Sequence, residues 1–322
     1  LGVFLYPFKL VQGILEARNV LSRERPRLVF SKGGPGSVAV GIAAWSLGIP
    51  LYIHESDTVP GFSNKVLGYF ATQIFLGFEE ARKYFPKGKA TVVGQILHPQ
   101  FFEKNPDGKI EWKTNKKHIF VSCGSQGSRK IFQTLLKQRK QFSKISKNNL
   151  FKTSQKQSNS SANREPEGGV QLYDEGGSGD LISKNAFFRS LDTEWIVSLG
   201  TLNRNLRSEF EKWEDTQVFD WIPQSDIPHI LDGTDIAITR ASATTLAELS
   251  TRPIHLMIIP LALSAGGHQV RNAQVYEKNG HTVVLEEDLE KRNVGDILRS
   301  SHRPIASNTK TIISPILRLF EA

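Results

Sequence analysis

The hydrophobic and polar positions of the chain form two series in which strand-like and helix-like segments alternate. In the first series, apolar residues at helical spacing from Pro7 to Leu21 predict a helix, and Arg27 to Phe30 predicts a short strand. The following segments are a helix at 38–47, a strand at 51–54, a helix at 62–70, a strand at 73–76, a short helix ending near residue 84 and a strand at 91–93. This alternation favours a parallel sheet with right-handed crossovers.

A second series begins with the strand HIFVS at 118–122, which leads through the turn CGSQGS into a helix ending near residue 140. Further strands are expected at 195–198, 217–219, 236–239, 254–259 and 282–285. Between residues 94 and 117 the pattern lapses into Pro, Asn, Asp and Gly, so we place the domain linker there. The expected fold class is α/β, with two doubly wound domains at 1–110 and 111–322.

Residues 143–193 interrupt the second series with Ser, Asn, Lys, Gln and Gly. A segment of this composition buries too little apolar surface to offset the entropy lost on ordering. We therefore expect a disordered insertion. The alternative is a helical or functional segment.

The length and the composition agree with two ordinary globular domains. A chain of 322 residues exceeds the size at which one hydrophobic core stops growing. Its hydrophobic content of 39% and charged content of 23% are typical of a soluble protein. The single Cys123 rules out an internal disulfide and a Cys-rich zinc site, and it favours a reducing, cytoplasmic setting.

The net charge of +9 is concentrated in one region. Residues 112–164 contain thirteen Lys and Arg and no Asp or Glu. We interpret this region as a solvated basic face, and the alternative is attraction to anionic lipid or to nucleic acid. Neither aromatic residues among the basic ones nor a known RNA-binding motif supports binding to nucleic acid, so we expect no nucleic-acid partner.

The sequence contains no run that approaches the roughly 20 apolar residues of a membrane-spanning helix. The chain begins with Leu, and LGVFLYPFKL lacks the pattern of a signal peptide. We therefore expect the chain to be truncated at its beginning.

Two glycine-rich turns join a strand to a helix, SKGGPGS at 31–37 and CGSQGS at 123–128. Glycine lets the backbone approach a phosphate closely, and a helix start presents free N–H groups. Glycine also occurs in such turns for geometry alone. Neither turn matches G-x-G-x-x-G or G-x-x-x-x-G-K, which argues against a dehydrogenase and a P-loop enzyme.

Polar side chains follow the strand predicted at 236–239. Hydroxyl groups and one cation gather where this strand turns into a helix, at Arg240, Ser242, Thr244 and Thr245. An ordinary helix cap explains one hydroxyl but not the cluster, and a bound diphosphate explains it better. Glu248 lies one turn further along, where a carboxylate can accept two hydroxyl hydrogen bonds from a ribose; a solvent-facing Glu is the alternative.

Two more polar groups end strands or begin helices. His268, Gln269 and Asn272 share the first turn of a helix, so their side chains can converge on one hydroxylated ligand. Polar first-turn residues without a ligand are the alternative. In the first domain, IHESDTVPG ends a strand with the titratable residues His54, Glu55 and Asp57. They can supply a general base at a domain cleft, or serve as cap and turn residues.

Together the motifs resemble the MurG family of bacterial glycosyltransferases, which add N-acetylglucosamine to the undecaprenyl-pyrophosphoryl-muramoyl-peptide precursor of the cell wall. The resemblance runs from about Leu10 to Gly280 without the insertion. It rests on five segments in order: KGGPGSVAVGIAAWSLGIPLYIHE, VPGFSNKVLGYFA, FVSCGSQGSRKI, TRASATTLAELS and GHQVRNAQVYEKNG. It implies the GT-B fold, two Rossmann-like domains facing a cleft, with the donor in the carboxyl-terminal domain and the acceptor in the amino-terminal one.

The resemblance also implies roles for individual residues. The donor UDP-N-acetylglucosamine would contact ten of them: Ser125, Gln126, Arg240, Ser242, Ala243, Thr244, Glu248, His268, Gln269 and Asn272. Within this set, Glu248 would hold the ribose, and Gln269 and Asn272 would read the sugar. On the acceptor side the resemblance places Gly33, Gly34 and Gly36, with Glu55, His54 and Asp57 as candidate catalytic residues.

The implied reaction is an inverting displacement in which the acceptor's C4 hydroxyl attacks the anomeric carbon as UDP departs, converting lipid I to lipid II. No cofactor and no obligatory metal are expected, because helix N-termini and hydroxyl donors can stabilise the leaving diphosphate. The lipid acceptor implies peripheral association with the anionic cytoplasmic face of the plasma membrane. An apolar patch at Phe4, Leu5, Phe8 and Ile14 would serve it, although a buried core face explains these residues equally well.

Three departures from the family pattern leave alternatives open. The family's first glycine-rich loop, Gly-Gly-Thr-Gly-Gly-His, would precede Leu1, and the Arg expected after the linker turn has only His98 near its position. The insertion at 143–193 is foreign to the pattern. The alternatives are a non-catalytic UDP-sugar-binding or scaffold protein that has lost the acceptor loop, and another GT-B nucleotide-sugar enzyme such as an epimerase.

Overall fold

The structure is a computed structural model that describes residues 6–103, 108–139 and 193–301. Contacts divide the described residues into two compact units, the first with 6–103 and 239–285, the second with 108–139, 193–238 and 286–301. The predicted domain bounds of 1–110 and 111–322 stay a prediction. The predicted insertion lies outside the described residues except for Thr193, where a strand begins.

The amino-terminal part of the first unit is built on four parallel strands in the order β1-β2-β3-β4. These are β1 (Val29–Ser31), β2 (Leu51–Glu55), β3 (Gln73–Leu76) and β4 (Ala90–Val92). The helices are α1 (Tyr6–Glu24), α2 (Ser37–Ser46), α3 (Phe62–Phe70), η1 (Glu79–Tyr84) and η2 (Pro99–Phe102). The predicted alternation is confirmed, and the short helix before residue 85 is a 3₁₀ helix, a form common in segments of this length.

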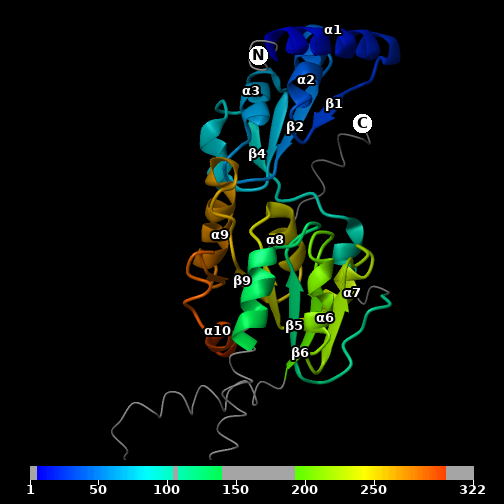
Figure 1. The fold of residues 1–322 in the computed structure, drawn as a ribbon. Helices are drawn as coiled ribbons and strands as arrows, with labels where there is room; N and C mark the ends of the chain where they lie inside the picture. The colour runs from blue at the N-terminus through cyan, green and yellow to red at the C-terminus, as the bar shows by residue number, and fades with distance from the viewer. Residues whose placement is uncertain (1–5, 104–107, 140–192, 302–322) are drawn as a thin grey trace, which may run out of the picture. The chain divides into compact units, whose positions relative to one another are not determined.

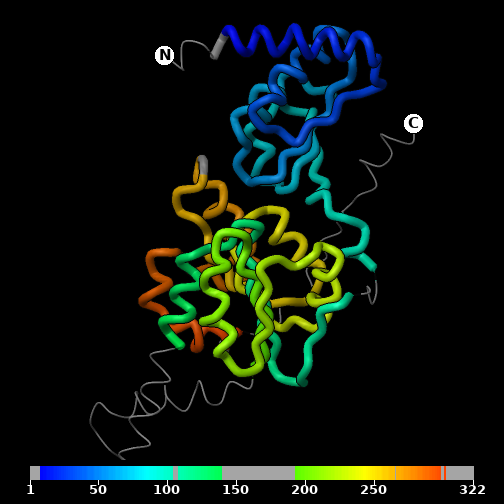
Figure 2. The backbone as a smooth tube through the Cα atoms, turned by 45° about the vertical axis from the view of Figure 1, so that its right-hand side comes forward, coloured from blue at the N-terminus to red at the C-terminus, as the bar shows by residue number. Residues whose placement is uncertain are grey.

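Apolar side chains cover both faces of this sheet because successive strand residues point to opposite sides. Leu51 and Ile53 of β2 belong to the buried cluster on one face. Tyr52, between them, stacks on Phe75 on the other face, with ring centroids 6.2 Å apart. Figures 1 and 2 show α1 lying across α2, and Gly13 allows this approach, since a Cβ there would lie 3.3 Å from the Cβ of Ala39.

The second sheet has six strands in the order β10-β9-β8-β5-β6-β7. The pairs β10–β9, β5–β6 and β6–β7 are parallel. Its strands are β5 (Lys117–Ser122), β6 (Thr193–Ser198), β7 (Thr216–Phe219), β8 (Ile236–Thr239), β9 (His255–Ile258) and β10 (Thr282–Val283). Strands β8 and β9 are buried along their whole length, as expected for a parallel sheet covered on both faces. Two parallel sheets confirm the predicted α/β class.

Helices follow most strands of the second sheet. A helix at 129–139 follows β5. The others are η3 (Arg204–Leu206), α6 (Arg207–Phe210), α7 (Ile227–Gly233), α8 (Ala243–Leu249), η4 (Ala265–Gly267), α9 (His268–Lys278) and α10 (Val294–Ser300).

A buried carboxylate of the second sheet holds residues 113 and 114 in place. Glu194 is buried on β6 and accepts hydrogen bonds from the N–H groups of Lys113 and Thr114 and from the Thr114 hydroxyl, at 2.9 to 3.0 Å. Trp112 stacks on His118, with ring centroids 4.3 Å apart. A buried charge needs such partners. Residues 112–114, within the expected linker, are therefore held in a fixed position on the second unit.

Candidate functional site

The last two residues of β2 and the turn that follows, residues 54–58 (together the β2 turn), hold the three predicted catalytic side chains. Glu55 is buried, and its Oε1 accepts the Asp57 N–H at 2.9 Å while its Oε2 accepts the Asn64 Nδ2 at 2.8 Å. Burial raises the pKa of Glu55, and these hydrogen bonds act against that rise. The carboxyl group therefore fixes the shape of the turn and has no oxygen without a partner.

His54 lies inside the same turn with no exposed surface. Its Nε2 is 2.9 Å from the Gly94 carbonyl oxygen, and its Nδ1 is 3.3 Å from the Ser56 hydroxyl oxygen. Burial lowers the pKa of His54 to about 4, so the neutral ring can donate from Nε2 and accept at Nδ1. These contacts give His54 a positioning function, and its predicted catalytic role stays a prediction.

Asn272, on the first turn of α9, joins the β2 turn to the end of β8. It is fully buried; its Nδ2 donates to Asp57 Oδ1 at 2.8 Å and to the Ala241 carbonyl at 3.2 Å. Its Oδ1 accepts from the Thr58 N–H at 3.0 Å and from the Thr58 hydroxyl at 2.9 Å. A carboxamide offers two donors and two acceptor positions, so Asn272 has no capacity left for a sugar hydroxyl unless Asp57 or Thr58 releases it.

The glycine-rich loop before α2 lies against Asn64, which the sequence did not single out. Gly33 and Gly34 adopt φ values of 88° and 106°, a left-handed backbone that favours glycine. A Cβ on Gly33 would lie 3.0 Å from Asn64 Oδ1, a buried atom with no hydrogen-bond partner in the described structure. Gly36 caps α2. The loop and the β2 turn thus share one side chain, while the predicted acceptor role of the three glycines stays a prediction.

Residues 240–248 (the β8 segment) carry the predicted uridine and diphosphate contacts. Arg240 donates from Nη1 to the Ile259 carbonyl at 3.2 Å. Ser242 occupies the N-cap of α8, but its side chain makes no capping hydrogen bond. Ala243 begins α8 and is buried, and Thr244 follows it partly buried.

Glu248 is the one carboxylate of residues 240–248. Its side chain is partly buried, and within the described residues it has no hydrogen-bond or ion-pair partner. Burial alone raises the pKa of Glu248 to about 7. A desolvated carboxylate without a partner is unfavourable in a free protein and is a common sign of a binding site.

Two left-handed glycines set the direction in which α9 begins. Gly266 and Gly267 have φ values of 65° and 67°, and His268 is the first residue of the helix. The Gln269 Oε1 accepts the Leu261 N–H at 3.0 Å. Its Nε2 has no partner in the part of the chain that the structure describes, so one face of this amide is available to a ligand.

In the second unit, the glycine turn at 123–128 interlocks with a turn at 199–203. The Ser125 carbonyl accepts the Thr201 N–H at 3.0 Å, and the Gln126 carbonyl accepts the Asn203 Nδ2 at 2.9 Å. A Cβ on Gly127 would overlap the Leu199 carbonyl, and a Cβ on Gly200 would overlap Gly127. The side chains of Ser125 and Gln126 remain exposed. The sequence did not point to Asn203, which is buried and holds the two turns together.

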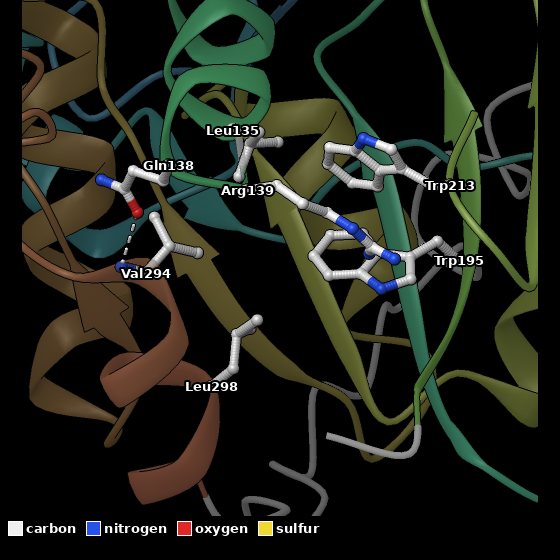
Figure 3. Close-up of a pocket in the computed structure, with 7 residues that line it drawn as sticks. All are labelled: Leu135, Gln138, Arg139, Trp195, Trp213, Val294 and Leu298. Carbon is white, nitrogen blue, oxygen red and sulfur yellow. Dashed lines mark hydrogen bonds between the residues drawn. The ribbon is translucent and has the colours of Figure 1, made fainter. Parts of the chain in front are cut away.

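A separate hollow in the second unit is lined by residues of the helix at 129–139, of β6 and of α10, and by Trp213 (Figure 3). Arg139 reaches toward two tryptophan rings there, with its Cζ 4.4 Å from the centroid of the Trp213 ring. Trp195 pairs with Ile119 in the first half of β6, whereas Ser125 follows the carboxyl end of β5. Nucleotides bind at the carboxyl ends of parallel strands, so this hollow is not the predicted donor site.

The described ranges contain neither a cluster of metal ligands nor a membrane-spanning helix. No group of three or more His, Cys, Asp or Glu side chains in them is arranged to hold a metal ion. Nor does any helix in those ranges have the length and apolar character needed to cross a bilayer.

Comparison with known proteins gives two family matches and a set of relatives. Residues 2–76 match the glycosyltransferase family 28 N-terminal domain, and residues 182–314 match the glycosyltransferase family 28 C-terminal domain. The chain is 32% identical over 312 residues to a UDP-N-acetylglucosamine--N-acetylmuramyl-(pentapeptide) pyrophosphoryl-undecaprenol N-acetylglucosamine transferase of Staphylococcus carnosus, covering 95% of the chain and 70% of the relative. An enzyme of the same name from Clostridium tetani is 29% identical, with 88% and 67% covered.

Solved structures share the fold. The crystal structure of MurG from Acinetobacter baumannii has a TM-score of 0.61 at 18% identity, covering 91% of this chain and 69% of that one. A UDP-GlcNAc 2-epimerase of Methanocaldococcus jannaschii, in complex with UDP-GlcNAc and UDP, has a TM-score of 0.54 at 11% identity, with 98% and 82% covered. At such identities the likeness concerns the fold alone, and it confirms the predicted GT-B class.

Proposed function

The chain belongs to the MurG family of N-acetylglucosaminyltransferases, within glycosyltransferase family 28, and on this premise we propose that it transfers N-acetylglucosamine from UDP-N-acetylglucosamine to a lipid-linked N-acetylmuramyl-pentapeptide. In the proposed reaction the C4 hydroxyl of the acceptor sugar attacks the anomeric carbon of the donor. The bond from that carbon to the diphosphate breaks with inversion, UDP departs, and the hydroxyl proton passes to a base. The product is the lipid-linked disaccharide-peptide.

The observation that carries this proposal is the hydrogen bond between Asp57 and Asn272. It joins the turn expected to face the acceptor to the helix expected to face the donor sugar. A displacement between two sugars requires a base within hydrogen-bond reach of the attacking hydroxyl, at the place where both substrates meet. Asp57 occupies such a place in the first unit.

Asp57 is a better candidate for the base than its two neighbours. It is partly exposed, and its Oδ1 accepts from Asn272 while its Oδ2 has no partner among the described residues. Glu55 and His54 are buried, and all their polar side-chain atoms are engaged within the turn or with Asn64 and Gly94. We therefore assign proton removal to Asp57 and positioning of the β2 turn to Glu55 and His54.

Donor binding is assigned to side-chain groups that have no partner among the described residues. Glu248 would accept hydrogen bonds from the ribose hydroxyls, and Gln269 would donate to the sugar from its Nε2. Ser125 and Gln126, whose carbonyls are tied to residues 199–203, present exposed side chains to the diphosphate. Hydrogen-bond donors of this kind stabilise a departing diphosphate without requiring a metal.

The acceptor is a lipid, and we propose that α1 brings the first unit to the membrane surface. Phe8, Val11 and Leu15 are spaced for one helix face, and all are exposed, Phe8 to 76%. Trp45 on α2 and Phe62 at the start of α3 are also exposed large apolar side chains. Apolar side chains next to Lys and Arg favour reversible binding to anionic lipid. Of the predicted patch, Phe4 and Leu5 lie outside the described residues, and Ile14 is half-buried.

The proposal is tested by transfer of labelled N-acetylglucosamine from UDP-N-acetylglucosamine to a lipid-linked muramyl-pentapeptide, with UDP release followed in parallel. We expect labelled lipid and UDP in equal amounts, with both absent when acceptor is omitted. An epimerised nucleotide sugar without labelled lipid would contradict the proposal and favour the epimerase alternative. Tight UDP binding without any turnover would favour the non-catalytic binder.

A further inference from the structure

Three cationic side chains from separate elements gather around one tyrosine of the first unit. The Nζ atoms of Lys65, on α3, and Lys83, on η1, lie 5.1 Å and 5.3 Å from the centroid of the Tyr84 ring. Arg271, on α9, donates from Nη1 to the Tyr84 hydroxyl at 2.8 Å. We call these four residues the Tyr84 cluster.

The described residues do not neutralise the positive charge of the Tyr84 cluster. Within the described chain no carboxylate pairs with Lys65, Lys83 or Arg271. The adjacent Arg82 shows the contrast, since it donates from Nη2 to Glu79 at 2.9 Å. Tyr84 is partly buried near the surface, where a cation over an aromatic ring gains about 0.5 to 1 kcal/mol, and neighbouring like charges repel. An anion bound at this cluster would therefore be favoured.

Two of the three elements that build the cluster, α3 and α9, also carry a residue that is hydrogen-bonded to the β2 turn. Lys65 follows Asn64, whose Nδ2 donates to Glu55. Arg271 precedes Asn272, whose Nδ2 donates to Asp57. An anion held by these cations would belong to a ligand that also reaches the β2 turn.

We propose that the Tyr84 cluster binds carboxylate groups of the acceptor's peptide. This inference rests on the proposed function, in which the acceptor carries a diphosphate and a peptide as its two anionic parts. The glycine loop with Gly33 and Gly34 is expected to face the diphosphate, which leaves the peptide for a second anionic contact. A guanidinium and two ammonium groups suit carboxylates, and the tyrosine ring offers a flat surface to the peptide chain.

The test compares two acceptors that share lipid, diphosphate and sugar, one with free peptide carboxylates and one with those groups amidated. The full chain and its variants Lys65→Gln, Lys83→Gln and Arg271→Gln are assayed at saturating UDP-N-acetylglucosamine, with Lys87→Gln as the matched control. Lys87 is exposed on the same segment and outside the cluster. For the carboxylate acceptor we expect each cluster variant to raise the acceptor KM about three- to ten-fold, with kcat unchanged. For the amidated acceptor we expect equal KM values in all proteins.

Several results would overturn the inference. A KM increase of equal size with both acceptors would place the anion on the diphosphate. Unchanged KM values in the variants would remove the cluster from the site. The variant that combines Lys65→Gln, Lys83→Gln and Arg271→Gln is also tested on vesicles of phosphatidylglycerol and phosphatidylcholine in equal parts. If it loses binding to these vesicles while Lys87→Gln keeps it, the cluster is assigned to lipid. An unmodified protein that transfers equally well to both acceptors would refute this inference alone, whereas absence of transfer to either would refute the proposed function with it.

Discussion

The β2 turn and the β8 segment both lead from the carboxyl end of a parallel strand toward a helix. They differ in whether their buried polar side chains have hydrogen-bond partners within the protein. In the β2 turn, Glu55 and His54 are buried and fully hydrogen-bonded. In the β8 segment, Glu248 is partly buried and has no partner among the described residues. Glu55 and His54 are therefore satisfied without a ligand, whereas Glu248 is not.

The pKa values of the two glutamates express the same difference. Burial raises the pKa of both, but hydrogen bonds from Asp57 and Asn64 oppose the rise at Glu55. Nothing opposes it at Glu248, whose pKa reaches about 7. Internal hydrogen bonds fix the orientation of a carboxylate that supports the local backbone. A carboxylate that binds a ligand keeps hydrogen-bond acceptors without a protein partner, which lowers the stability of the free protein.

The largest expected effect tests whether the preorganised region performs the chemistry. Asp57→Asn keeps an oxygen for Asn272 but removes the base, so kcat should fall about 100- to 1000-fold. The donor KM and the melting temperature should change little. Turnover of labelled donor and thermal unfolding measure the two effects. A kcat within three-fold of the unmodified protein would show that Asp57 is not the base.

The next effect tests the incomplete region. Glu248→Gln removes a carboxylate that would accept two ribose hydrogen bonds, so affinity for UDP should fall about ten-fold in calorimetry. The folded-state pKa of Glu248 lies above its unfolded value, so its stabilising contribution is present below pH 4.5 and is lost as the pH rises through about 7. At pH 8 the variant should therefore be more stable in free form, by about 1 kcal/mol for this partly exposed group. Weaker UDP binding together with lower stability would indicate simple misfolding.

A change of pH sharpens the same comparison without mutation. Between pH 8 and pH 6 the Glu248 carboxylate becomes protonated and loses part of its capacity to accept hydroxyl hydrogen bonds, because the pKa of Glu248 is about 7. UDP affinity should fall several-fold over this interval. Calorimetry at both pH values should find a much smaller change in Glu248→Gln. An equal decline in both proteins would assign the pH dependence to another group.

The smallest expected effect concerns the contact between the two regions. Thr58→Val removes the hydroxyl that donates to Asn272 and leaves the backbone N–H bond. Stability should fall by about 1 kcal/mol, and donor affinity should rise about two-fold because one acceptor position of Asn272 is released. Thr58→Ser, which keeps the hydroxyl, is the control. Weaker donor binding in the valine variant would mean that Thr58 orients the amide for the sugar.

Periodicity predicted most of the fold because apolar spacing is a local property. The strands at 73–76 and 236–239 and the helix at 62–70 have the predicted bounds. Composition predicts a linker at 94–117, yet Lys113 and Thr114 within it are held by Glu194 from β6. That contact joins segments about eighty residues apart, which no local pattern reports.

The candidate site was predicted residue by residue, but not its connections. Asp57 and Asn272 are separated by 215 positions, and neither sequence context indicates that their side chains meet. Asn64 was overlooked because it lies within an otherwise ordinary amphipathic helix, and its importance comes from the buried Glu55 beside it. Polar residues inside apolar helices are the one local signal that would have found it.

The interlocked turns at 123–128 and 199–203 constrain how this protein can be recombined with its homologues. At positions 127 and 200 each turn has no room for a side chain because the other turn lies against it. The two segments therefore fit each other only as a pair. A chimera that imported one turn alone would force the two backbones apart at the place where Ser125 and Gln126 are presented. The two turns must therefore be exchanged together, although more than seventy residues separate them in the chain.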